Sequence, residues 1–329
     1  MKKSKMKAAI YNRYGPADVV KLAEVPRPVP KPEQIFVAVR ASAVTTADSM
    51  IRQGMPRWGR LFLGLRRPRT TAMGTQFAGE VIEVGADVKD FRIGDRVFGE
   101  TGMAFGAHAE FISVNADEMV AHIPEGMSFE EAAPLCDGPL TDMNFLRNLA
   151  DLKPGQHILI NGAAGSLGSA AVQLAKSLGA EVTGVCSTRN VDFVRSLGAD
   201  HVIDYTKDDF TKQPEMYDVI FDTVGKSDFR SSKPALKRGG AYVSPVLSLR
   251  LLGHMLWSGW FGSKKAKFSA TGMLPVDKQK PLLRELLDRI AQGHLKMVID
   301  KRFGLDQIVE AHAYVDTGHK RGNVILQVG

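Results

Sequence analysis

The spacing of apolar residues changes along the chain and divides it into three parts. From Lys7 to about Val120 the apolar residues form short runs between glycine, proline and aspartate turns, a pattern that predicts β-strands. The clearest runs cover residues 35–40, 77–85, 95–98 and 109–114. This first part of the chain is therefore expected to be rich in short strands.

The second part alternates strands with helices. A helix is predicted to begin at Ser128, because Ser128 and Glu131 have the spacing of a capping box. Predicted strands follow at 157–160, 181–185, 201–203, 217–222 and 240–244, with helices at 169–178 and 191–197. This alternation predicts parallel strands joined by crossover helices. The tail, with helices near 278–292 and 305–317 and strands near 297–303 and 323–327, is expected to leave that sheet.

Composition is that of an ordinary globular protein. The chain has 329 residues, of which 44% are hydrophobic and 24% charged, and is long enough for two cores. Its net charge is +7, but basic residues are spread along the chain without a nucleic-acid-binding motif, so no nucleic acid partner is expected. Cys136 and Cys186 form no C-x-x-C pair, and the start has no secretory pattern. These features favour a cytoplasmic location.

The most specific motif is the glycine-rich turn after the strand at 157–160. Gly165 lets a phosphate approach the backbone, Gly168 lets the following helix pack closely on its strand, and the amides of the helix N-terminus attract negative charge. Ala163 stands where the usual motif has its first glycine. We expect a dinucleotide pyrophosphate to bind at Ala163, Ala164, Gly165, Ser166, Leu167 and Gly168. A tight turn in an unrelated α/β protein is the alternative.

The residues after the next strand bear on which dinucleotide binds. An acidic residue there would hold the ribose hydroxyls of NAD, but the chain reads Gly184-Val-Cys-Ser-Thr-Arg-Asn190. Ser187 can donate a hydrogen bond and Arg189 can pair with a 2′-phosphate, so NADPH is favoured over NADH. The alternative for Arg189 is a solvated cation in a surface loop.

Several fragments are distributed over nearly the whole chain: Met6-Lys-Ala-Ala9, Gly74-Thr-Gln-Phe-Ala-Gly79 with Val84-Gly85, Gly94-Asp-Arg-Val97, the glycine-rich turn, and the segments 197–205, 217–225 and 318–324. Together they resemble the medium-chain dehydrogenase/reductase family, in its zinc-independent quinone oxidoreductase-like branch. The resemblance implies an α/β protein: a GroES-like β-rich catalytic domain at 1–126 and 275–329, and a Rossmann domain with a doubly wound parallel sheet at 127–274. It also implies a homodimer.

The same resemblance assigns further cofactor-binding residues. It implies that Tyr205 lies beside the adenosine phosphate, and that Thr141, Val224 and Gly225 approach the nicotinamide. Arg321 and Asn323, in the matching segment 318–324, are expected to bind the cofactor as well.

No zinc is expected. Zinc-dependent relatives place a cysteine or similar ligand in the segment matching 44–48 and a His-Glu pair where this chain has Thr75-Gln76. They also carry a four-cysteine lobe after the segment matching 94–97, where this chain has no cysteine. None of the eight histidines falls in a ligand spacing such as H-x-x-x-H.

The expected reaction is hydride transfer from NADPH to a small-molecule electron acceptor, a quinone or a conjugated enone or enal. Thr45, Asp48 and Gln76 are the catalytic candidates beside the acceptor, and no general acid is assigned. Thr45 replaces an asparagine common in zinc-free relatives, and Gln76 replaces an aspartate of the family motif. The alternative for Asp48 is a structural acid that caps the following turn.

Other interpretations stay open. Within enzymes the alternative is alcohol or aldehyde interconversion, which would need a metal or an acid beside the carbonyl. A non-catalytic NADPH-binding protein is another. The apolar stretch 246–261 is interpreted first as a buried substrate wall or dimer contact and second as a membrane-surface contact. The basic and apolar segment 56–69 is either a loop that attracts acidic acceptors or a solvated surface loop.

Overall fold

The computed structural model describes residues 5–329, and contacts divide the chain into two compact units. Unit 1 comprises Met1–Asp137 and Ile299–Gly329, and unit 2 comprises Gly138–Val298. By these contacts the helix α9 (Val276–Ala291) groups with unit 2. The domain limits that the sequence suggested, 1–126 with 275–329 and 127–274, stay a prediction.

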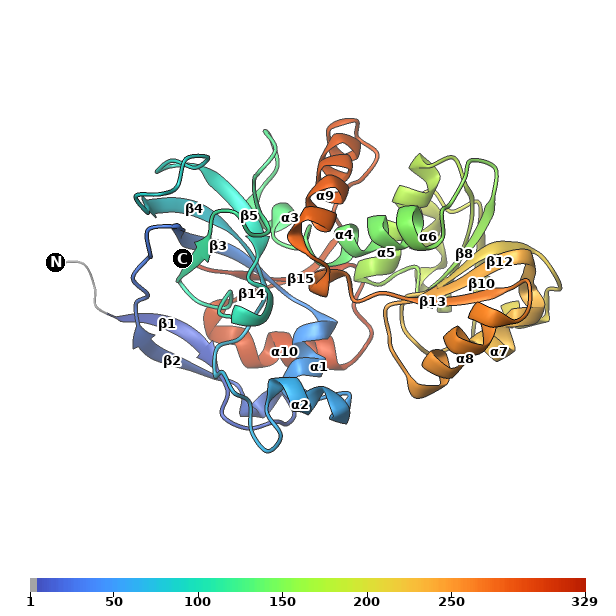
Figure 1. Cartoon of the computed structure of the whole chain (residues 1–329), viewed down its shortest axis with the longest axis horizontal. Coiled ribbons are helices and arrows are strands. Elements are labelled where there is room, and N and C mark those ends of the chain that lie inside the picture. The colour runs from blue at the N-terminus through green and yellow to red at the C-terminus, as the bar shows by residue number, and fades with distance from the viewer. Residues whose placement is uncertain (1–4) are drawn as a thin grey trace. The chain divides into compact units, whose positions relative to one another are not determined.

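Unit 1 is rich in antiparallel strands (Figure 1). Strands β1 (Lys5–Ile10) and β2 (Lys21–Pro26) form a two-stranded sheet. A second sheet has seven strands in the order β14-β15-β3-β4-β5-β7, with β6 paired to β3. Its strands are β3 (Gln34–Val44), β4 (Gln76–Val84), β5 (Arg96–Glu100), β6 (Phe111–Asn115), β7 (Val120–His122), β14 (Ile299–Gly304) and β15 (Asn323–Gln327). The helices are α1 (Thr46–Gln53), α2 (Arg60–Leu63), α3 (Phe129–Ala132) and α10 (Ile308–Asp316).

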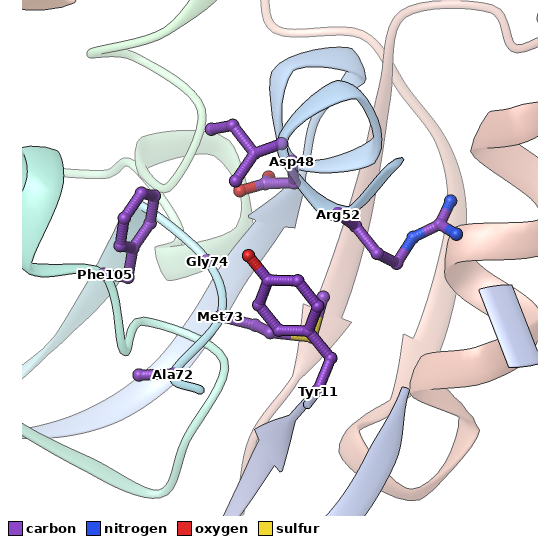
Figure 2. A pocket seen from close by; sticks show the side chains of 8 residues that line it. Tyr11, Asp48, Arg52, Ala72, Met73, Gly74 and Phe105 are labelled. Carbon is purple, nitrogen blue, oxygen red and sulfur yellow. The ribbon is translucent and has the colours of Figure 1, made fainter. Parts of the chain in front are cut away.

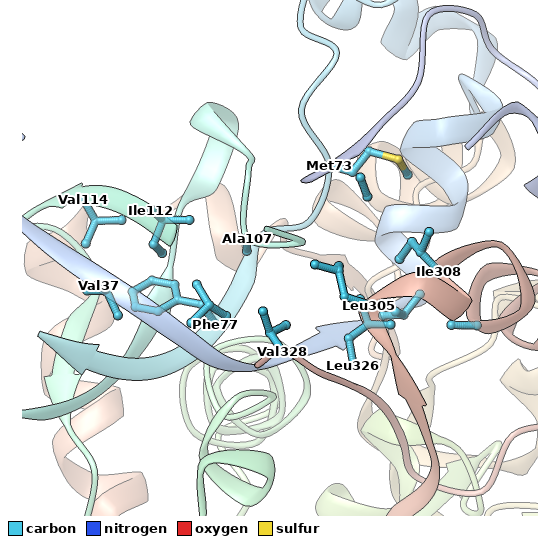
Figure 3. Close-up of a cluster of buried hydrophobic side chains, with 14 of the residues drawn as sticks. Val37, Met73, Phe77, Ala107, Ile112, Val114, Leu305, Ile308, Leu326 and Val328 are labelled. Atoms are coloured by element: carbon cyan, nitrogen blue, oxygen red, sulfur yellow. The ribbon is translucent and has the colours of Figure 1, made fainter. Parts of the chain in front are cut away.

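The core of unit 1 joins the returning tail to the first strands. Val37 and Phe77 from neighbouring strands are fully buried, and Leu326 of β15 and Ile308 of α10 belong to the same cluster (Figure 3). The antiparallel register pairs Ile325 of β15 with Ala43 of β3. This packing fixes the end of β3 and the start of β4, where the catalytic candidates stand.

Unit 2 is built on six parallel strands in the order β10-β9-β8-β11-β12-β13. Numbered along the unit this is the order 3-2-1-4-5-6 of a doubly wound sheet, so the expected fold class is confirmed. The strands are β8 (His157–Asn161), β9 (Glu181–Cys186), β10 (His201–Asp204), β11 (Tyr217–Asp222), β12 (Leu236–Ser244) and β13 (Lys265–Phe268). The sequence reading missed β13, a four-residue edge strand in which lysine alternates with apolar residues.

Besides α9, the helices of unit 2 are α4 (Gly138–Met143), α5 (Ser166–Ser177), α6 (Val191–Ser196), α7 (Phe229–Ser232) and α8 (Leu249–Trp260). Helix α5 begins three residues earlier than predicted, so Ser166, Leu167 and Gly168 form its first turn. Among residues 5–329, no helix combines the length and the apolar character needed to cross a membrane.

Candidate functional site

The glycine-rich turn joins the buried strand β8 to helix α5. Gly162 has a φ of +82°, a left-handed conformation that glycine adopts without strain, and its amide donates to the carbonyl of Val185 at 3.1 Å. The N-cap of the 12-residue helix α5 is Gly165, which has no side chain to accept from the first-turn amides. An N-terminus of this kind suits an anion, because its amides and the helix dipole both attract negative charge.

Two glycines of this turn have different surroundings. A Cβ added at Gly168 would lie 2.1 Å from the carbonyl oxygen of Gly162 and 2.7 Å from the Cα of Ala163. Only glycine therefore lets α5 pack this closely on the turn. A Cβ at Gly165 would meet nothing closer than the Gly162 carbonyl oxygen at 3.4 Å. The space beside Gly165 is open, and Ala163 is fully buried.

The candidates for the adenosine end gather where β9 and β10 end. The amide of Tyr205 donates to the carbonyl of Cys186 at 3.0 Å, so Tyr205 follows β10 beside the residues that follow β9. Tyr205 is 60% exposed, and Arg189 is exposed as well. Ser187, half-buried, accepts from the side chain of Asn190 at 3.3 Å.

The sequence reading found no carboxylate at the end of the second strand, but tertiary structure brings one close. Asp204 ends β10 in register with Cys186. Its carboxylate accepts from Thr188 Oγ1 at 2.6 Å and from Thr206 Oγ1 at 2.7 Å, and these hydrogen bonds hold the pKa of Asp204 below its usual range. The Asp204 carboxylate is thus hydrogen-bonded by two hydroxyls, that of Thr188 after β9 and that of Thr206 after β10.

The candidates for the nicotinamide end, Val224 and Gly225, are held by Asp222 at the end of β11. This carboxylate is fully buried, and its Oδ1 accepts from the amides of Val224 at 3.2 Å and Gly225 at 3.0 Å. Asn161, at the end of β8, donates to the same oxygen at 3.0 Å. Asp222 therefore links the glycine-rich turn to the loop after β11.

Thr141 lies on α4, which packs against α5. A Cβ added at Gly138, one turn before Thr141, would lie 3.5 Å from the carbonyl oxygen and the Oγ of Ser166. Unit 2 thus places Thr141 on the helix that adjoins the first turn of α5. Arg321 and Asn323 belong to unit 1, where they flank the start of β15; the Arg321 amide donates to Asp300 at 2.9 Å.

In unit 1, Thr45 and Asp48 form a reciprocal cap at the start of α1. Thr45 Oγ1 accepts from the Asp48 amide at 3.0 Å, and Asp48 Oδ2 accepts from the amide and the hydroxyl of Thr45, both at 2.8 Å. Burial raises the pKa of Asp48 to about 6, although the hydrogen bonds from Thr45 oppose the shift. Asp48 therefore caps helix α1, as the alternative interpretation of this residue expected. A contact with an acceptor stays a prediction.

Gln76 begins β4 and pairs in register with Glu100 at the end of β5. The side chain of Gln76 is 1% exposed and hydrogen-bonds to Glu100, while its Oε1 has no partner among residues 5–329. Burial and the neighbouring Asp137 raise the pKa of Glu100 to about 8. Burial also raises the pKa of Asp137 to about 6, and Lys320 opposes that shift. Two further acids with raised pKa values, Glu100 and Asp137, thus lie near Gln76, and the sequence analysis named neither.

A small pocket opens beside Asp48 (Figure 2). Tyr11, at the end of β1, points its hydroxyl toward the carboxyl of Asp48, while Arg52 turns away from both. Burial raises the pKa of Tyr11 to about 12, and the Asp48 charge adds to the shift. Met73 and Phe105 supply apolar walls.

Three of these residues were missed by sequence reasoning: Asp222, Glu100 and Tyr11. For Asp222 a signal existed, since a carboxylate that ends a parallel strand lies at the edge where ligands bind in such sheets. The sequence held no such signal for Glu100 or Tyr11. Glu100 reaches Gln76 through the register between β4 and β5, and Tyr11 reaches Asp48 only when distant parts of the chain fold together. Across residues 5–329, no three His, Cys, Asp or Glu side chains are placed to hold a metal ion, so the described residues do not fit a zinc centre. Its absence from the protein stays a prediction.

Comparison with known families gives two matches. Residues 31–125 match the alcohol dehydrogenase GroES-like domain, and residues 197–326 match a family described as zinc-binding dehydrogenase. The two models cover parts of both units.

Individual proteins match over almost the whole chain. The 2-methylene-furan-3-one reductase of Solanum lycopersicum is 33% identical over 98% of this chain and 79% of its own length. The structure of the quinone oxidoreductase from Coxiella burnetii is 30% identical, with a TM-score of 0.86 over 99% of this chain and 100% of that one. The Escherichia coli quinone oxidoreductase complexed with NADPH is 26% identical, with a TM-score of 0.85 over 98% and 99%.

Proposed function

The chain belongs to the medium-chain dehydrogenase/reductase family, in its quinone oxidoreductase-like branch, and is an oxidoreductase that uses a nicotinamide cofactor; from that premise we propose that it transfers hydride from NADPH to a quinone or a conjugated enone or enal without zinc. The observation that carries the proposal is the N-terminus of α5, which has a glycine N-cap and follows the central strand β8 of a doubly wound sheet.

The residues of unit 2 divide the work of holding the cofactor. The first-turn amides of α5 bind the pyrophosphate, and Gly165 keeps their approach open. Arg189 pairs with the 2′-phosphate that distinguishes NADPH from NADH. Asp222 holds the amides of Val224 and Gly225 in place for the nicotinamide. When bound, NADPH supplies the hydride.

The acceptor is a small molecule that is already electron-poor. A hydride and a proton convert a quinone to a hydroquinone, and an enone to a saturated ketone, and neither change requires a Lewis acid to stabilise an alkoxide. Thr45, Asp48 and Gln76 are proposed to contact the acceptor. The names of the tomato reductase and of the bacterial quinone oxidoreductases support both acceptor classes.

The deciding experiment follows NADPH oxidation by chelator-treated protein, with a naphthoquinone and with a conjugated enone in parallel assays. Turnover with either acceptor supports the proposal, and the preferred acceptor identifies the substrate class. Inhibition by chelator that added zinc reverses would overturn the metal-free mechanism. NADPH binding without turnover on either acceptor would favour a non-catalytic binder.

We also propose that the protein is a homodimer. Sedimentation velocity over a range of protein concentrations tests this, and a single species at the monomer mass of 35.9 kDa contradicts it.

A further inference from the structure

Glu100 stands in a row of residues that crosses the seven-stranded sheet of unit 1 near one end. The register pairs Glu100 of β5 with Gln76 of β4, and Gln76 with Ala43 of β3. Thr45, a catalytic candidate, follows β3 at the same end of the sheet. Residues directly opposite each other on antiparallel strands point to the same face. Glu100 therefore shares a face with Gln76, which is proposed to contact the electron acceptor.

The side chain of Gln76 holds the carboxyl group of Glu100. Gln76 is 1% exposed and donates a hydrogen bond to that carboxyl group. The donor is Nε2, the only side-chain donor of a glutamine, while Oε1 has no partner within the described chain, 5–329. One oxygen of Glu100 is thus fixed by Gln76, and the second oxygen is left to carry a proton.

Three acids with raised pKa values lie in this part of unit 1, and Glu100 is the one of the three that keeps its proton at neutral pH. Burial and the Asp137 charge raise the pKa of Glu100 to about 8, with a smaller contribution from Asp48. Burial raises the pKa values of Asp48 and Asp137 only to about 6. Cys136, whose pKa is raised by burial and by Glu100, stays a thiol.

Lys320 accounts for the difference between Asp137 and Glu100. Its ammonium group donates to the carbonyl of Gly322 at 3.1 Å in the turn before β15, and its charge lowers the pKa of Asp137. Burial lowers the pKa of Lys320 to about 8, and Asp137 and Asp300 oppose that shift. Lys320 thus favours an ionised Asp137, and the negative charge of Asp137 favours a neutral Glu100.

A neutral acid beside the electron acceptor matters more for an enone than for a quinone. Hydride transfer to the β-carbon of an enone breaks the carbon–carbon π bond and leaves an enolate, whose α-carbon must take a proton. A quinone takes its proton on oxygen, to which solvent transfers protons rapidly. Proton transfer to carbon is slower, so a positioned acid accelerates the reduction of an enone more.

We propose that Glu100 is the proton donor in the reduction of a conjugated enone and delivers its carboxyl proton to the α-carbon of the enolate. The α-carbon gains a C–H bond, the O–H bond of Glu100 breaks, and its electron pair stays on the carboxylate. Glu100 is half-buried rather than sealed, so the carboxylate regains a proton from solvent before the next turnover. This inference rests on the proposed function and makes an enone the preferred electron acceptor.

Other acids near the site are less suited to this role. Asp48 Oδ2 accepts two hydrogen bonds from Thr45, both at 2.8 Å, and these favour the carboxylate. Tyr11 is the main competitor, because its hydroxyl points toward the carboxyl of Asp48 (Figure 2). Its pKa is raised to about 12, chiefly by burial, so Tyr11 is a much weaker acid than Glu100.

The face of the α-carbon that receives the proton tests the assignment. An α-methyl cyclic enone is reduced in D2O with unlabelled NADPH, and chiral gas chromatography with mass spectrometry analyses the product. The wild-type protein should place deuterium on one face and give one enantiomer. Glu100→Gln keeps a neutral partner for Gln76 but carries no acidic proton. It should give both enantiomers in similar amounts and slow enone turnover by about a hundredfold or more, with a smaller loss on a naphthoquinone.

The pH dependence of kcat with the enone provides a second measurement. For the wild-type protein kcat should fall above about pH 8, where Glu100 loses its proton, and Glu100→Gln should lack this fall. Asp137→Asn should move the fall to lower pH, because it removes a negative charge that raises the pKa of Glu100. An unmoved fall in Asp137→Asn, or the same fall in Glu100→Gln, contradicts the assignment.

The matched control is Glu80→Gln, which removes another carboxylate from the sheet of unit 1. Glu80 on β4 is 41% exposed and lies 3.6 Å from Arg40, so single-face delivery and kcat should be retained. Single-face delivery that persists in Glu100→Gln overturns the inference even if turnover is slower, since Glu100 would then act only on positioning. Loss of single-face delivery in Tyr11→Phe, with retention in Glu100→Gln, assigns the proton to Tyr11 instead.

The wild-type protein separates this inference from the reaction on which it rests. Enone reduction that gives both enantiomers leaves the proposed function standing and overturns the role of Glu100, because solvent then supplies the proton. Absence of turnover with the enone and with the naphthoquinone refutes the proposed function itself, and this inference with it.

Discussion

The hydroxyl of Tyr242 donates a 2.8 Å hydrogen bond to the carboxylate of Asp222, and the ring of Tyr242 is itself buried. Asp222 Oδ2 also accepts from the amide of Ser227 at 3.0 Å, while Oδ1 serves the amides of Val224 and Gly225. Burial and the Asp222 charge raise the pKa of Tyr242, so it stays a donor at all ordinary pH values. Tyr242 on strand β12 therefore helps to hold the loop that follows the neighbouring strand β11.

Tyr242→Phe should lower the free energy of unfolding by about 1–2 kcal/mol, because one donor to a buried carboxylate is lost. It should also weaken NADPH binding, since the loop of Val224 and Gly225 loosens. Urea unfolding and a binding titration measure the two effects. The matched control is Tyr217→Phe on strand β11, which removes a 2.6 Å hydrogen bond from the Tyr217 hydroxyl to the side chain of Gln213 and should lower stability alone. Equal NADPH affinity in both variants would contradict the role of the loop.

Gly168→Ala and Gly165→Ala should separate folding from cofactor binding. The first places a Cβ 2.1 Å from a carbonyl oxygen, so we expect α5 to shift and stability to fall by about 2–4 kcal/mol. The second finds open space at a φ of −76°, which alanine adopts readily, so folding should persist while NADPH affinity falls. Thermal unfolding and a fluorescence titration distinguish them. Undiminished affinity in Gly165→Ala argues against a phosphate at that turn.

Arg189→Ala should weaken NADPH binding about tenfold to a hundredfold and leave NADH binding nearly unchanged. In the proposed role, the guanidinium of Arg189 would make charge-assisted hydrogen bonds to the 2′-phosphate, a group that NADH lacks. Calorimetric titration with both cofactors measures the ratio. Arg195→Ala, an exposed arginine on α6 that pairs with Asp192 at 3.3 Å, serves as the control for net charge. A parallel loss for both cofactors rules out the assigned role.

Stability should fall as the pH rises through the neutral range, and Glu100 should be a main cause. The pKa of Glu100 is raised from 4.5 to about 8 in the folded protein, chiefly by burial and then by Asp137. The folded state therefore binds the proton more tightly than the unfolded state, and stability is lost between about pH 4.5 and 8. One such group contributes at most about 1.4 kcal/mol per pH unit.

Glu100→Gln should flatten this dependence, because the amide keeps a neutral partner for Gln76 without titrating. Urea unfolding at several pH values between 5 and 8.5, roughly the window of the Glu100 shift, provides the measurement. Asp48 and Asp137, whose pKa values are also raised by burial, act in the same direction. An unchanged slope in Glu100→Gln would show that Glu100 is ionised in the folded protein.

Local signals carried much of the sequence analysis. The capping box of Ser128 and Glu131, the glycine-rich turn and the alternation of strands with helices all appear where they were expected. Such features depend on residues close together in the chain, so the sequence alone records them. The edge strand β13 was missed, because its alternation of lysine with apolar residues extends over only four residues, too few to distinguish a strand from a loop.

The sequence by itself determined the fold class, the family and the turn suited to a pyrophosphate, because glycine placement and strand–helix order are local properties. Only the tertiary structure decided that Asp222 organises the loop of Val224 and Gly225, that Gln76 faces Glu100, and that the outer face of α8 is apolar and exposed. Each of these depends on the register between strands or on which face of a helix packs inward. Burial, which sets the pKa of Glu100, arises only when distant segments meet.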